Sequence, residues 1–157
     1  MTVPLQWRLM KIGQRVHRLM YAAGLGPFIG RIILLLTTRG RRTGKRRVTP
    51  LQYEEIEGAI YVGSARGQQA DWFRNILTDP QVEVRVKERY FQGIATPLTD
   101  ARLIADYLET RLQHYPRMVG AMMRMHKLPA RPTRSQLEEL AAQLAVVAIH
   151  PLIGNNK

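Results

Sequence analysis

Short segments that resemble β-strands fill most of the chain between residues 32 and 97, and this pattern limits the fold more than any other. Val82, Val84 and Val86 alternate with charged residues, as in a strand with one buried face. Turn residues such as Glu57-Gly58 separate neighbouring segments, which favours pairing in hairpins. The predicted strands are residues 32–38, 48–54, 59–65, 82–86 and 89–97.

Helical patterns interrupt and flank these strands. Residues 69–77 predict a short helix that ends at Asp79-Pro80. Thr99 or Asp100 caps a second helix that runs to about His114. Further helices are expected at residues 4–23, 115–127 and 133–143, and the apolar residues 144–149 predict a final strand.

The order of these elements indicates one domain over residues 1–157, mainly β with flanking helices (α+β). Hairpins with helices at both ends favour a small closed or partly closed barrel over a parallel sheet. We expect an amphipathic helix in residues 1–26, a barrel core in 30–98, a helical segment in 99–143 and a closing strand in 144–151.

The chain has a net charge of +12 and no cysteine. The charge favours an anionic partner, which could be nucleic acid, an anionic membrane surface or a polyanionic cofactor. The missing cysteines exclude disulfides, thiolate metal sites and cysteine nucleophiles. The four histidines are scattered without metal-ligand spacing, so no metal site is predicted. We expect Glu54, Glu55 and Glu57, at one hairpin end, to be solvated.

Residues 39–47 form a basic loop between two predicted strands, and six of these nine residues are basic. Gly40 and Gly44 allow a tight turn, and the amides around them can form a concavity that binds anions. We therefore predict a phosphate or carboxylate site here. The alternative is a solvated loop that only keeps the hairpin soluble.

The helix predicted at residues 4–23 has one apolar face and a basic face. Such a helix can lie on an anionic membrane, or it can cover one end of the core. No apolar run reaches the roughly 20 residues of a membrane-spanning helix, and no secretory signal is present. We expect a cytoplasmic protein, with peripheral contact to the inner face of the membrane as a possibility.

Several motifs together resemble the deazaflavin (F420)-dependent nitroreductase and quinone reductase family. Members of this family have a split β-barrel fold related to the flavin-mononucleotide-binding split barrels. The motifs are Gly40-Arg41-Arg42-Thr43-Gly44, Arg47-Val48-Thr49-Pro50-Leu51, Ser64, and Trp72-Phe73-Arg74-Asn75-Ile76-Leu77 with Asp79-Pro80.

The resemblance implies an oxidoreductase that passes a hydride from reduced coenzyme F420 to a quinone, enone or nitro compound. FMN and FAD are the alternative cofactors. The implied cofactor-binding residues are Arg41, Thr43, Gly44, Lys45 and Arg47 for the phosphate and tail, and Thr49, Pro50, Gln52, Ser64, Ala65, Arg66, Gly67, Trp72 and Asn75 around the ring. Ser64 or Tyr115 would donate a hydrogen bond or proton to the acceptor. Tyr115 and Met118 would line the substrate side.

The chain departs from the family where Ala65-Arg66 replaces a cofactor-contacting lysine and where Met118 and Ala121 replace tyrosines of the substrate wall. These changes keep two other functions open. One is a nucleic-acid-binding barrel, which the lack of a stacking motif disfavours. The other is a non-catalytic cofactor-binding or membrane-surface protein. The sequence fits a monomer or a homodimer equally well.

Overall fold

The computed structural model describes residues 33–64 and 66–153. The expected N-terminal helix at residues 1–26, its proposed lipid contact through residues 4–23, and the ring contact expected of Ala65 lie outside this part of the chain. Within the described ranges, no helix is long and apolar enough to cross a bilayer.

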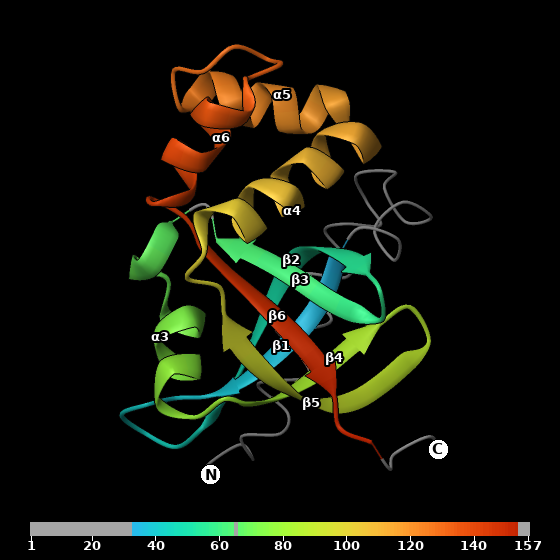
Figure 1. The fold of residues 1–157 in the computed structure, drawn as a ribbon. Coiled ribbons are helices and arrows are strands. Elements are labelled where there is room, and N and C mark those ends of the chain that lie inside the picture. Colours follow the sequence, from blue (N-terminus) through green and yellow to red (C-terminus); the bar gives the residue numbers. More distant parts are fainter. Residues whose placement is uncertain (1–32, 65, 154–157) are drawn as a thin grey trace, which may run out of the picture.

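Six antiparallel strands form a closed barrel (Figure 1), which confirms the predicted fold class. The strand order around the barrel is β1-β2-β3-β6-β5-β4. The last strand enters between β3 and β5, so it closes the barrel as expected. The strands are β1 (Ile33–Arg39), β2 (Arg46–Ile56), β3 (Ala59–Ser64), β4 (Gln81–Val86), β5 (Arg89–Pro97) and β6 (Ala145–Pro151).

The barrel core consists of inward-facing apolar residues of the strands and of apolar side chains from one helix beside the barrel. Leu36 and Val84 are fully buried. Trp72 and Phe73, from α3 (Asp71–Thr78), pack into the same core. The predicted helix at residues 69–77 is two elements, because Gly67–Gln69 form the 3₁₀ helix η1 and the α-helix starts only at Asp71.

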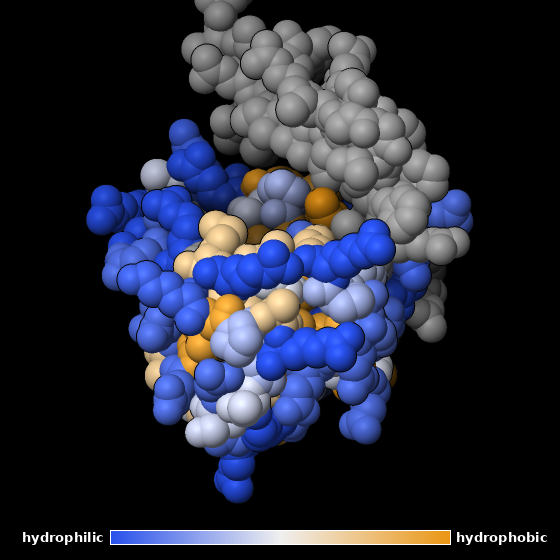
Figure 2. Space-filling view, turned by 90° about the horizontal axis from the view of Figure 1, so that it is seen from above, coloured by the Kyte–Doolittle hydropathy of each residue, from blue (hydrophilic) through white to orange (hydrophobic). Residues whose placement is uncertain are grey.

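Three helices gather at one end of the barrel in Figure 1 and bury a second core: α4 (Ala101–His114), α5 (Pro116–Met125) and α6 (Arg134–Ala141). Asp100 caps α4 by accepting from the Arg102 amide at 2.9 Å, and this hydrogen bond lowers the pKa of its carboxyl group. Thr133 and Gln136 form a capping box at α6. Seen from the helical end, hydrophilic side chains surround exposed apolar ones (Figure 2).

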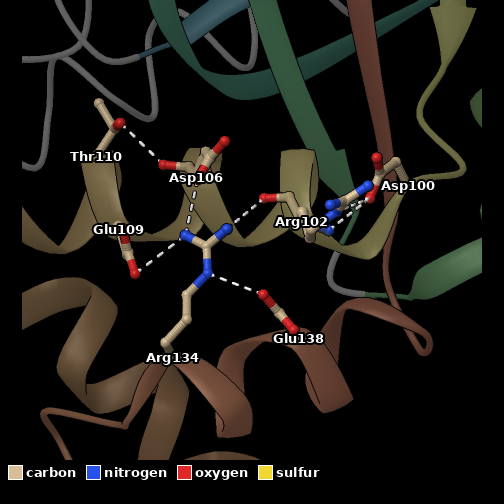
Figure 3. Close-up of polar contacts among 7 residues, drawn as sticks. All are labelled: Asp100, Arg102, Asp106, Glu109, Thr110, Arg134 and Glu138. Carbon is tan, nitrogen blue, oxygen red and sulfur yellow. Dashed lines mark hydrogen bonds and ion pairs between the residues drawn. The ribbon is translucent and has the colours of Figure 1, made fainter.

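Arg134 fastens α6 to α4 (Figure 3). Its Nη1 atom lies 2.7 Å from Asp106 Oδ1 and 3.1 Å from Glu109 Oε1, both on α4. Its Nη2 atom donates to the Arg102 carbonyl at 2.9 Å, and its Nε atom donates to Glu138 at 3.0 Å. These carboxylates hold the pKa of Arg134 above its usual value. The network joins α4, the first helix after β5, to α6, the last helix before β6.

Candidate functional site

Two cavities adjoin each other on the outside of the barrel. The first, which we call the helix-side cavity, has a volume of about 590 Å³ and lies between the strands β2 and β3 and the helices α4 and α5. The second, the tip cavity, has a volume of about 540 Å³ and lies between the loop after β1 and α3. Thr49, Asp71 and Trp72 line both cavities. A ligand can therefore extend from one cavity into the other.

The loop between β1 and β2 is a compact turn that uses its own amides. The Gly40 amide donates to the Lys45 carbonyl at 2.8 Å, and the Gly44 amide donates to the Gly40 carbonyl at 2.7 Å. The Lys45 amide donates to Thr43 Oγ1 at 3.3 Å. The expectation that amides beside the glycines bind an anion is wrong for these three groups, because the turn already occupies them. These three amides are therefore not available to a bound anion.

Arg41 is tied to α3. Its amide and its Nη1 atom both donate to Asn75 Oδ1, at 3.2 and 3.1 Å, and Nη2 lies 3.2 Å from Asp71 Oδ1. Asn75 in turn donates to Thr38 Oγ1 at 3.1 Å in the interior. Asn75 thus supports the tip loop, and it also lines the tip cavity, so its contact with a cofactor stays a prediction.

The remaining cations of the tip differ in how they are paired. Arg39 lies 4.0 Å from Asp79, and Arg46 forms an ion pair with Glu83. Within residues 33–64 and 66–153, Arg42, Lys45 and Arg47 form no ion pair.

Of these three cations, Arg42 and Arg47 line the tip cavity together with Thr43. Lys45 and Gly44 do not line it, and a methyl group added at Gly44 would meet no atom within 4 Å. Arg41 lines the tip cavity as well, so three arginines face it: Arg41, which is paired with Asp71, and Arg42 and Arg47, which form no ion pair among the described residues.

The helix-side cavity has mainly apolar walls with a few polar groups. Pro50, Gln52, Ser64, Arg66 and Met118, all predicted site residues, line it. Ser64 Oγ accepts from the Arg66 amide at 3.1 Å, so its own proton stays available for donation. The apolar lining residues are Leu51, Leu108, Val119, Met122, Leu144 and Val146.

Gly67, which was expected to contact a ring, has a structural role, and the ring contact stays a prediction. Its φ of +58° is strained for other residues, and an added Cβ atom would lie 2.7 Å from the Gln143 carbonyl oxygen. The residue holds η1 close to the start of β6 and lines neither cavity.

A buried charged cluster behind the helix-side cavity was not predicted. Arg111 and Glu54 have side chains that are only 5% exposed, and Arg111 Nη1 lies 3.8 Å from Glu54 Oε1. The other Glu54 oxygen lies 2.8 Å from His114 Nδ1. The expectation that Glu54 is solvated is wrong, because α4 covers this part of β2. Arg111 lines the cavity.

The sequence carried one signal for this cluster. Ile104, Leu108 and Arg111 follow the spacing of one helix face, so Arg111 occupies a position where an apolar residue is expected. A charge on that stripe indicates a buried partner, but the sequence does not say which carboxylate it is.

The rings of two tyrosines lie near Arg111. Its guanidinium carbon is 5.9 Å from the centre of the Tyr107 ring and 5.7 Å from that of Tyr115. Burial raises the pKa of Tyr107 to about 12, so this cavity-lining phenol stays protonated at neutral pH. Tyr115, predicted as a substrate contact, does not line the cavity, because its ring packs against Arg111 and His114.

The part of the chain with described coordinates contains no group of three or more metal-ligating side chains.

Structural comparison finds similar folds. An F420-H2 dependent reductase, FDR-A, is 19% identical over 76% of this chain and 95% of its own, with a TM-score of 0.53. The heme storage protein HutZ from Vibrio cholerae is 16% identical over 79% of this chain and 84% of its own, with a TM-score of 0.56. Such identities establish a shared fold.

The sequence itself gives the family. Residues 11–131 match the model of the F420H(2)-dependent quinone reductase family. The match covers most of the barrel and continues through α4 and α5. The chain therefore belongs to the F420H(2)-dependent quinone reductase family.

Proposed function

We propose that the protein is an oxidoreductase that uses reduced coenzyme F420 to reduce a quinone, with enones and nitro compounds as further acceptor classes. One observation carries this proposal: a cationic cavity adjoins a mainly apolar one, and Trp72 lines both. F420 has two parts that match these cavities, because its polyanionic tail suits the cationic cavity and its flat ring suits the apolar one.

The donor set of the tip cavity fits the tail. Arg42 and Arg47 line it without an ion pair among the described residues, and Thr43 adds a hydroxyl group. Charge-assisted hydrogen bonds from guanidinium groups suit phosphates and carboxylates. FMN carries one phosphate and FAD a pyrophosphate, so a tail with several carboxylates gains more from these cations. This difference is the reason for placing F420 ahead of the flavins.

When bound, the deazaflavin supplies the hydride, so the protein does not need a nucleophile. Thr49 and Trp72, at the junction of the cavities, would orient the ring. The apolar walls would exclude water and strengthen polar contacts to the acceptor. The Ser64 hydroxyl, which keeps its proton free, would donate to an acceptor oxygen as negative charge develops there.

The test is equilibrium binding of oxidised F420, FMN and FAD to purified protein. We expect F420 to bind most tightly and Arg47→Ala to weaken it about tenfold, the loss of one charge-assisted hydrogen bond. Arg89→Ala is the control, because Arg89 pairs with Glu55 away from both cavities. Equal losses in the two variants would refute the assignment of the tip cavity.

A turnover assay distinguishes an enzyme from a non-catalytic cofactor-binding protein. We expect anaerobic oxidation of reduced F420 in the presence of menadione, a naphthoquinone. Tight F420 binding without reduction of a quinone, enone or nitro acceptor would instead support a non-catalytic cofactor-binding protein.

A further inference from the structure

The orientation of the Gln52 side chain is fixed by its partner. Arg111 Nη2 donates to Gln52 Oε1 at 2.5 Å. A guanidinium group has donors and no acceptor, so only the amide oxygen of Gln52 can face Arg111. The amide nitrogen must therefore lie on the other side, where Nε2 is 3.4 Å from Met118 Sδ.

Among the described residues, the Gln52 amide nitrogen has no strong acceptor there. A thioether sulfur is a weak acceptor, and the amide has two hydrogens to donate. Gln52 and Met118 both line the helix-side cavity, and Gln52 is exposed. A neutral donor thus stands at the exposed wall of a mainly apolar cavity, where a ligand oxygen that displaces water can accept a hydrogen bond from it.

Arg111 is held firmly enough to fix this donor. Its side chain is 5% exposed, the carboxylate of Glu54 lies 3.8 Å away, and the centres of the Tyr107 and Tyr115 rings lie 5.9 and 5.7 Å from its guanidinium carbon. Moving the guanidinium would separate it from the buried carboxylate of Glu54, whose other oxygen lies 2.8 Å from His114 Nδ1, and separating a buried ion pair is costly. Since Arg111 places positive charge beside the amide oxygen, it also makes the amide N–H groups stronger donors.

We propose that Gln52 Nε2 binds an oxygen of the electron acceptor, and that Arg111 is the positioning residue that orients and polarises this donor. The ligand class is a flat molecule with a carbonyl oxygen, such as a quinone, whose ring lies against the apolar wall. The acceptor role rests on the proposed function. It moves Gln52 from the cofactor, where the resemblance placed it, to the substrate.

The experiment compares two ligands that differ in their oxygens. Isothermal titration calorimetry of the cofactor-free protein measures menadione and 2-methylnaphthalene, which has the same ring without carbonyl groups. The wild type should prefer menadione about tenfold through this hydrogen bond. Gln52→Glu keeps an acceptor for Arg111 but removes the donor, so the preference should vanish. Gln92→Glu, an exposed position on β5, should retain it.

Arg111 needs its own variants, because removing one buried charge can unfold the protein. The double variant Glu54→Gln/Arg111→Met removes both charges of the pair, and Arg111→Lys keeps a cationic donor. We expect the double variant to lose most of the menadione preference and Arg111→Lys to keep part of it. A purely structural role for Arg111 would change the affinities for both ligands by the same factor, and that result would overturn its positioning role.

Turnover adds a second readout. In Gln52→Glu the KM for menadione should rise about tenfold, while the Kd of F420 stays unchanged. If Gln52→Glu keeps the menadione preference, or if the wild type has none, the inference is wrong even when quinone is reduced. If the preference behaves as expected but reduced F420 is not oxidised, the donor assignment stands and the proposed function fails.

Discussion

Glu54 and Glu55 are neighbours in the sequence with different surroundings. Consecutive strand residues point to opposite faces, so only Glu54 faces α4. There it meets Arg111 in the interior, whereas Glu55 accepts two hydrogen bonds from Arg89 at the surface, at 3.2 and 2.9 Å. The same side chain therefore has a different energetic role at the two positions.

Glu54→Gln should lower the free energy of unfolding by roughly 3 kcal/mol, because it leaves Arg111 as an uncompensated buried charge. Glu55→Gln should cost less than about 1 kcal/mol, as exposed ion pairs contribute little. Urea denaturation of both variants measures this difference. Glu54→Gln/Arg111→Met should recover most of the loss, since the buried charge is then gone. Equal losses in the two single variants would mean that Glu54 is solvated after all.

At the scale of elements, local chemistry allowed most boundaries to be predicted. Asp100 and Thr133 cap the helices that they were expected to start, and Glu57-Gly58 forms the expected turn with positive φ angles of 52° and 81°. The Arg111 cluster could not be predicted in the same way. Its partner Gln52 is 59 residues away, and only packing of α4 on β2 brings them together.

Arg134 is the main polar link between α4 and α6, so its removal should destabilise the packing of these two helices. Arg134→Met should lower the melting temperature and speed amide hydrogen exchange in α6 more than in β4. The fall in melting temperature relative to the wild type should be smaller in 1 M salt, because charges are then screened beyond about 3 Å. Arg124→Met is the matched control, because Arg124 lies on α5 and forms no ion pair among the described residues. An unchanged exchange rate in α6 would show that apolar packing alone holds the layer.

For the whole molecule, the path of the chain explains why the cavities adjoin. The chain leaves the barrel after β5, forms the helical layer of α4, α5 and α6, and returns to the barrel as β6. Strand β6 pairs with β3 and β5. The layer is thus attached at both ends, and α4 and α5 lie over the outer face of β2 and β3. The tip loop, at the end of the β1–β2 hairpin, meets α3 beside that face. Hairpin patterns predicted a barrel, but the β3–β6 pairing is long-range and left no local signal.

The dependence of ligand binding on particular charges distinguishes the proposed enzyme from a nucleic-acid-binding barrel. The net charge of +12 would attract any polyanion, whereas F420 binding is assigned to Arg42 and Arg47 in the tip cavity. Raising the salt from 0.1 to 1 M shortens the screening length from about 10 to about 3 Å, so F420 affinity should fall.

The salt dependence should be shallower in Arg42→Ala/Arg47→Ala and unchanged in Arg85→Ala/Arg89→Ala, which removes the same charge from residues that line neither cavity. Titrations of F420 at several salt concentrations give these slopes. If both double variants flatten the slope equally, the overall charge attracts the ligand and the tip cavity does not. Duplex DNA that displaces F420 from the wild type at physiological salt would then favour the nucleic-acid alternative, because phosphate contacts distributed over the surface depend on total charge.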